Sequence, residues 1–158
     1  MYRNEPLDKY LLDAAAGTPA PGGGSIAAFV GALATTMVSM SAKFTVGKEE
    51  FKQFDSQLKK ILEECEKSRE TLLSLMEEDI KVYGDVNKAL ELSKSNEAER
   101  NKRSEAIQKA TIMAMIVPLK ATMCCLYVLQ QTRALVDIVN PNLISDVGVA
   151  CYLADAAF

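Results

Sequence analysis

The stretch T-P-A-P-G-G-G-S-I-A-A-F-V-G-A-L-A-T-T-M-V-S-M-S-A-K-F-T-V-G-K, residues 18–48, decides the fold of this chain. Its prolines and glycines exclude a regular element across residues 18–24. Ser25 is a good N-cap for a helix that runs to about Val46, with Gly47 just past its end. Because this helix is rich in alanine, serine and glycine, a neighbouring backbone can approach it closely. The sequence therefore predicts a stiff loop that leads into a long, central, buried helix.

Both ends of this predicted helix have features of a ligand site. The first turn of a helix carries backbone N–H groups without intrahelical partners, and a glycine-rich turn lets an anion approach them. The residues of that turn are Gly22, Gly23, Gly24 and Ser25. Lys43 and Lys48 lie near the opposite end, about 27 Å away, so only a long anionic ligand or a site shared between two subunits would reach both. The alternative is that the glycines only form a turn and the lysines only mark the helix end.

Length, composition and charge narrow the class of protein. With 158 residues and 49% hydrophobic content, the chain is expected to form a single domain with a proper core. A net charge of −3 argues against nucleic-acid binding, which needs clustered excess lysine and arginine. The N-terminus lacks the apolar run of a secretory signal, so we expect a cytoplasmic protein. The uncharged span 25–42 approaches membrane-spanning length, but its five Ser and Thr residues make a membrane span the weaker alternative.

The chain contains no histidine, which excludes Ser-His-Asp catalysis and every metal site that needs imidazole. We therefore expect no bound metal, and acid–base chemistry that uses Asp, Glu, Lys, Tyr or Cys. The cysteines lack the paired spacing of a zinc site and are expected to be reduced core thiols. They are Cys65, Cys124, Cys125 and Cys151.

Apolar residues that recur every three or four positions from Glu49 to Leu92 predict an outer helix with one buried stripe. A helix of this length would exceed 60 Å, so we expect a kink or break between Ser74 and Gly84. Asp79 lies in that region and follows two glutamates. Ile80 and Tyr83 flank Asp79 near the buried stripe, so this carboxyl is expected to turn inward, where desolvation would raise its pKa. The alternative is that Asp79 belongs to a solvated acidic face.

A further helix is expected from about Glu99, with a kink or restart at Pro118. Its continuation to Val139 is nearly all apolar, which predicts a buried helix. Its methionines, Met113, Met115 and Met123, are expected to fill gaps in the core. The sequence Asn140-Pro141-Asn142 breaks that helix and caps another, which places Asp146 in a first turn, where acidic residues commonly serve only as helix-dipole partners.

Five motifs, in the same order along nearly the whole chain, resemble the cyclodeaminase/cyclohydrolase family. They are T-P-A-P-G-G-G-S at 18–25, K-F-T-V-G-K ending at Lys48, D-I-K-V-Y with Asp79, V-P-L at 117–119 and N-P-N-L-I-S-D-V-G-V-A at 140–150. The family includes the C-terminal domain of formiminotransferase-cyclodeaminase and stand-alone methenyltetrahydrofolate cyclohydrolases. The resemblance implies an all-α fold: an up-and-down helical bundle with a central buried helix, assembling as a homodimer. It also implies that residues 1–158 form one domain without the last helices of the family.

The function that the resemblance implies is formimidoyltetrahydrofolate cyclodeamination, with methenyltetrahydrofolate cyclohydrolysis as the close alternative. A third alternative is a non-catalytic helical oligomer that binds folate or a protein partner. A tetrahydrofolate derivative, with or without a polyglutamate tail, would be the substrate, with no tightly bound cofactor. A separate formiminotransferase is the alternative to acting without a protein partner. Carried over by motif position, Asp79 is the expected proton shuttle and Lys43 its helper. The expected substrate-binding residues are Gly22, Gly23, Gly24, Ser25, Lys48, Asn142 and Asp146.

Overall fold

The computed structural model describes all 158 residues and contains helices only. Five α-helices and three short 3-10 helices follow one another along the chain. The α-helices are α1 (Leu7–Ala15), α2 (Gly23–Lys43), α3 (Asp55–Glu91), α4 (Glu97–Val136) and α5 (Ile144–Ala157), and the 3-10 helices are η1 (Tyr2–Asn4), η2 (Glu49–Phe54) and η3 (Pro141–Leu143). The expected all-α fold is confirmed.

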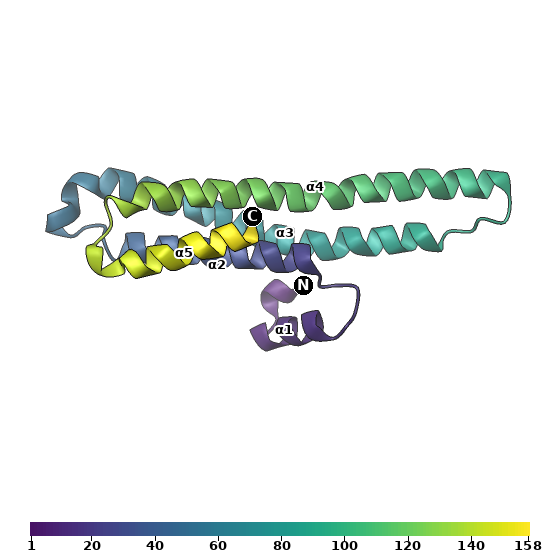
Figure 1. Ribbon diagram of the computed structural model, residues 1–158, viewed down its shortest axis with the longest axis horizontal. Coiled ribbons are helices and arrows are strands. Elements are labelled where there is room, and N and C mark those ends of the chain that lie inside the picture. Colours follow the sequence, from purple (N-terminus) through teal and green to yellow (C-terminus); the bar gives the residue numbers. More distant parts are fainter.

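Helices α2, α3, α4 and α5 form an up-and-down bundle in which each helix runs opposite to the next (Figure 1). Helix α2 lies at its centre and packs against α3, α4 and α5. Gly31 shows why small residues are needed there. A Cβ at this position would lie 2.8 Å from Cys125 Sγ on α4 and 3.2 Å from Leu72 on α3. The prediction of a central buried helix is thus confirmed.

The boundaries of three helices differ from the prediction. Helix α2 begins at Gly23 with Gly22 as its N-cap, so Ser25 lies inside the first turn and does not cap it. Helix α3 continues without a break through Gly84, because α4 packs along it on both sides of that point. Helix α4 likewise continues through Pro118, whose ring is exposed while Val117 beside it is buried. Packing on both sides of these residues outweighs their local tendency to break a helix.

Helix α4 is not buried as its composition predicts. One of its faces carries apolar side chains spaced at helical intervals, and each is about half exposed or more. These are Ile112, Met115, Leu119, Met123 and Leu126, with exposures of 46–65%. Met113 is also 43% exposed, so the prediction that the three methionines fill the core is wrong. The cysteines are all free; Cys65 and Cys125 are buried as expected, Cys124 is half-buried, and Cys151 is exposed.

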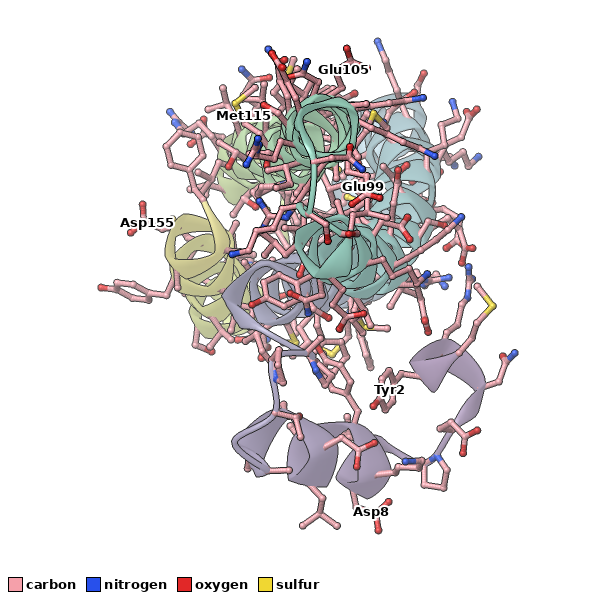
Figure 2. All side chains as sticks on the ribbon, turned by 90° about the vertical axis from the view of Figure 1, so that its right-hand side faces the viewer. Tyr2, Asp8, Glu99, Glu105, Met115 and Asp155 are labelled. Atoms are coloured by element: carbon pink, nitrogen blue, oxygen red, sulfur yellow. The ribbon has the colours of Figure 1, made fainter.

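Two parts of the chain project from the bundle. Helix α1 lies apart from the four long helices (Figures 1 and 2), and Leu7, Leu11 and Leu12 on it are exposed. Beyond the start of α2, the end of α3 and the beginning of α4 continue as a two-helix extension, joined by the loop at residues 92–96. We call residues 82–113 the arm. No third helix runs beside the outer part of the arm.

Two helices are long and apolar enough to pass a composition test for membrane spans: α2, with 56% of its most apolar window buried, and α4, with 22%. The core helix of a soluble protein passes the same test, so this result is weak evidence for a membrane span.

Candidate functional site

The carboxyl group of Asp79 lies against the first turn of α2. A Cβ on Gly24 would be 2.3 Å from Asp79 Oδ1 and 2.8 Å from its Cγ, so only glycine at position 24 leaves room for this carboxyl. The two residues are 55 positions apart, and their contact joins the middle of α3 to the start of the central helix. The glycine-rich turn and Asp79 thus belong to one site, which we call the α2-start site.

A buried hydrogen-bond chain holds the α2-start site in place. Ser25 Oγ donates to the backbone carbonyl of Met76, at 2.9 Å. A serine hydroxyl has a single proton, so the Tyr10 hydroxyl donates to Ser25 Oγ, also at 2.9 Å. Ser25 is fully buried and Tyr10 is 2% exposed. The hydroxyl of Ser25 therefore joins α1, α2 and α3 and has no free donor for a ligand.

Burial raises the pKa of the Asp79 carboxyl, because the partly buried carboxylate loses hydration. The nearby backbone N–H of Ser25 partly opposes this rise. Burial also raises the pKa of Tyr10, and the nearby charge of Asp79 adds to that rise. The expectation that Asp79 turns inward, in preference to a solvated acidic face, is confirmed.

The backbone amides at the start of α2 therefore face an anion that belongs to the protein. Helix N-termini attract negative charge, and here the Asp79 carboxylate occupies that position. A second anion bound at the same turn would be repelled by it. Substrate binding at Gly22, Gly23, Gly24 and Ser25 stays a prediction, and the negative charge of Asp79 disfavours an acidic group of the substrate at this turn.

The other predicted site residues lie at the opposite end of the bundle. Lys43 is the last residue of α2, about 30 Å from its start, and Lys48 follows in the next turn; both are exposed. The backbone N–H of Asn140 donates to Thr45 Oγ1 at 3.1 Å, which brings the Asn-Pro-Asn turn to this end of α2. Asn142 in that turn is exposed, and Asp146 in the first turn of α5 is half-buried.

One chain thus separates the predicted residues into two groups: Asp79 with the glycines, and Lys43 with Lys48, Asn142 and Asp146. Lys43 does not reach Asp79 within a single chain. Sequence reasoning also missed Tyr10, whose position on the apolar side of a short helix gave no sign of its contact with Ser25. No group of three Cys, Asp or Glu side chains is arranged to hold a metal ion.

The fold and the α2-start site define an all-helical bundle domain with a sheltered carboxyl at the start of its central helix. A family model described as formiminotransferase-cyclodeaminase matches residues 6–158. The chain therefore belongs to the formiminotransferase-cyclodeaminase family, as the motifs indicated.

Three relatives show how far the likeness extends. The chain is 35% identical, over 99% of its own length and 75% of the relative, to a methenyltetrahydrofolate cyclohydrolase from Methylorubrum extorquens. It is 30% identical to the formimidoyltransferase-cyclodeaminase of Mus musculus, over 91% of this chain and 27% of that protein. The crystal structure of formiminotetrahydrofolate cyclodeaminase from Thermotoga maritima superimposes with a TM-score of 0.87 at 27% identity, covering 99% of this chain and 74% of that one.

Proposed function

We propose that the protein is an enzyme that carries out acid–base chemistry on the one-carbon unit of a tetrahydrofolate derivative, with Asp79 as the proton shuttle. The observation that carries this proposal is the half-buried Asp79 carboxyl against Gly24, in a chain without histidine. A general acid–base works best when its pKa lies near the working pH, and burial moves the pKa of Asp79 in that direction.

In the cyclodeaminase reaction, N10 of 5-formiminotetrahydrofolate attacks the formimino carbon and a tetrahedral intermediate forms. The formimino group reacts in its protonated form, C=NH2+, so the nitrogen of the intermediate is an NH2 group. The Asp79 carboxylate would take the proton from N10 and deliver it to this NH2 group, which leaves as ammonia. The product is the 5,10-methenyl compound. One carboxyl that accepts and then returns a proton suffices for this sequence.

In the cyclohydrolase reaction, water attacks the same carbon of the 5,10-methenyl compound. Asp79 would take one proton from that water and return it to the ring nitrogen whose bond to the carbon breaks. The remaining hydroxyl proton passes to solvent, and the carbon becomes a formyl group. The higher identity to a cyclohydrolase, 35% over 99% of the chain, favours this reaction. The close superposition on a cyclodeaminase favours the first. The two reactions use the same carboxyl.

Methenyl absorbance distinguishes the reactions. The purified protein is incubated separately with 5-formiminotetrahydrofolate and with 5,10-methenyltetrahydrofolate. Absorbance that appears together with free ammonia identifies a cyclodeaminase, and absorbance that decays faster than the uncatalysed rate identifies a cyclohydrolase. Binding without either change would contradict the enzymatic proposal and support the non-catalytic folate-binding alternative.

A second copy of the chain is the proposed partner for the exposed face of α4. Ile112, Met115, Leu119, Met123 and Leu126 lie on that face. The neighbouring α5 exposes Val149 and Tyr152, and Phe158 directly after it is also exposed, by 46–80% for the three. Side chains of this size expose on the order of 100 Å² each. Eight of them approach the roughly 800 Å² that each partner buries in a standard interface, more apolar surface than monomers commonly expose.

In a homodimer, the residues around Lys43 of one subunit would lie beside the α2-start site of the other subunit. Lys43, Lys48, Asn142 and Asp146 remain proposed substrate-binding residues on that basis, with Lys43 as the proposed helper of Asp79. The mouse relative carries a transferase in its name and is almost four times as long as the segment matched here. A separate formiminotransferase therefore remains a proposed partner of the cyclodeaminase reaction.

A further inference from the structure

A basic hollow lies near the tip of the arm. It has a volume of about 300 Å³ and is lined by Lys94, Arg100, Arg103, Ser104 and Ile107. Three of these five residues are cations, and none is acidic. We call this hollow the tip pocket. None of the five motifs includes residues of the tip pocket, and the pocket is not part of the α2-start site.

The cations of the tip pocket form no ion pairs, although residues 91–105 carry as many carboxylates as cations. Lys94 and Arg100 form no ion pair. Arg103 donates from Nε and Nη2 to the backbone carbonyl of Leu90, at 3.3 and 3.0 Å, and its charge is not neutralised there. Glu99, in the same region, accepts instead from the Ser93 hydroxyl and from the backbone N–H of Ser95. The pocket thus presents cations and a serine hydroxyl to an incoming anion.

One face of α3 extends from the α2-start site toward the tip of the arm, where the backbone carbonyl of Leu90 accepts from Arg103 of the tip pocket. Asp79, Tyr83, Val86 and Leu90 are spaced by four, three and four residues, so they share one side of the helix. Tyr83 and Leu90 are 43% and 47% exposed on that side, where α2 no longer covers the arm (Figure 1). Leu90 is 11 residues from Asp79, a rise of about 16 Å, and its carbonyl holds Arg103.

The Asp79 carboxylate already occupies the anion position at the start of α2, so acidic groups of a substrate need a different site. We propose that the tip pocket binds the carboxylate end of the folate substrate while the one-carbon unit lies at Asp79. This inference rests on the proposed function. A folate ends in a glutamate with two carboxylates, and arginine side chains bind carboxylates through paired, charge-assisted hydrogen bonds. The exposed face with Tyr83 would lie beneath the aromatic middle of the substrate.

The test compares two double variants of equal charge change. Lys94→Gln/Arg100→Gln removes two cations of the tip pocket that make no hydrogen bond within the fold. Lys59→Gln/Lys102→Gln, the control, removes two exposed cations outside it. We expect the first variant to raise KM about tenfold or more with kcat changed less than twofold, because each lost charged hydrogen bond weakens ground-state and transition-state binding equally. The control should leave both parameters within about twofold of wild type. An unchanged KM, or an equal rise in the control, would overturn the inference and leave the proposed function intact.

A binding measurement decides the inference separately from turnover. The probe is p-aminobenzoylglutamate, which carries the dicarboxylate end without the pterin, titrated calorimetrically into wild type and both double variants. A dissociation constant that rises about tenfold only in Lys94→Gln/Arg100→Gln supports the tip pocket, even if wild type turns over neither folate substrate. Equal affinity in all three proteins, or no binding to wild type, contradicts it.

Discussion

Asp79 Oδ1 lies so close to Gly24 that an added Cβ on Gly24 would be 2.3 Å from it. The position of this carboxyl therefore depends on the absence of a side chain at residue 24. The contact is made between residues 55 positions apart. It couples the start of the central helix to the group that we propose as the proton shuttle.

Replacing Gly24 with alanine should displace the Asp79 carboxyl and lower kcat about tenfold or more, since small misplacements of a reacting group are costly. The matched control is Gly148→Ala, because Gly148 is also helical and an added Cβ there meets nothing within 4 Å. Steady-state kinetics on both variants check this. Wild-type kcat in a folded Gly24→Ala variant would show that the Asp79 position does not matter.

Replacing Asp79 with asparagine keeps the shape and removes the proton shuttle. We expect kcat to fall about a hundredfold or more while the helical circular-dichroism spectrum stays the same. Full activity in the folded variant would exclude Asp79 from the mechanism.

The same variant has a predicted pH dependence of stability. The pKa of Asp79 is raised in the folded state above the reference value of 3.8, so the contribution of this group to stability is fully present below that value. It is lost as the pH rises through the folded-state pKa. Relative to Asp79→Asn, the wild-type protein should therefore lose thermal stability between acidic and neutral pH. A difference in melting temperature between the two proteins that does not change with pH would contradict this.

Replacement by alanine should change the free energy of unfolding in opposite directions at two buried serines. Ser25→Ala leaves the Tyr10 hydroxyl and the Met76 carbonyl without their partner and should cost about 1–3 kcal/mol of unfolding free energy. The hydroxyl of Ser41 is buried with no hydrogen-bond partner, so Ser41→Ala should stabilise the protein by about 1 kcal/mol. Denaturant unfolding of both variants measures this, and destabilisation of similar size in both would contradict it.

The exposed face of α4 gives a prediction about assembly. Met123 is 65% exposed, so Met123→Asp should leave the folded chain intact and convert the proposed dimer into a monomer. Light scattering after size-exclusion chromatography measures the mass. Lys59→Asp, on the exposed side of α3, is the control and should remain dimeric. A wild-type mass of one chain would contradict the proposed assembly.

The helical class and the central helix could be predicted because residue spacing and the long uncharged stretch are local signals. The inward turn of Asp79 was also predictable, since Ile80 and Tyr83 lie beside it in sequence. Its contact with Gly24 was not, because no local signal identifies a partner 55 residues away. The continuity of α3 and α4 through Gly84 and Pro118 was missed for the same reason: tertiary packing outweighs local propensity. Apolar composition also could not distinguish burial within one chain from a face left exposed, as on α4.

The arm has a consequence for local motion. Its helices pack on each other with no third helix beside their outer part, so opening its outer turns exposes little apolar surface and costs less than opening the centre of the molecule. Backbone amides of residues 86–104 should therefore exchange with deuterium well before those of α2. The tip of the arm can therefore unfold locally while the four-helix part of the molecule stays folded.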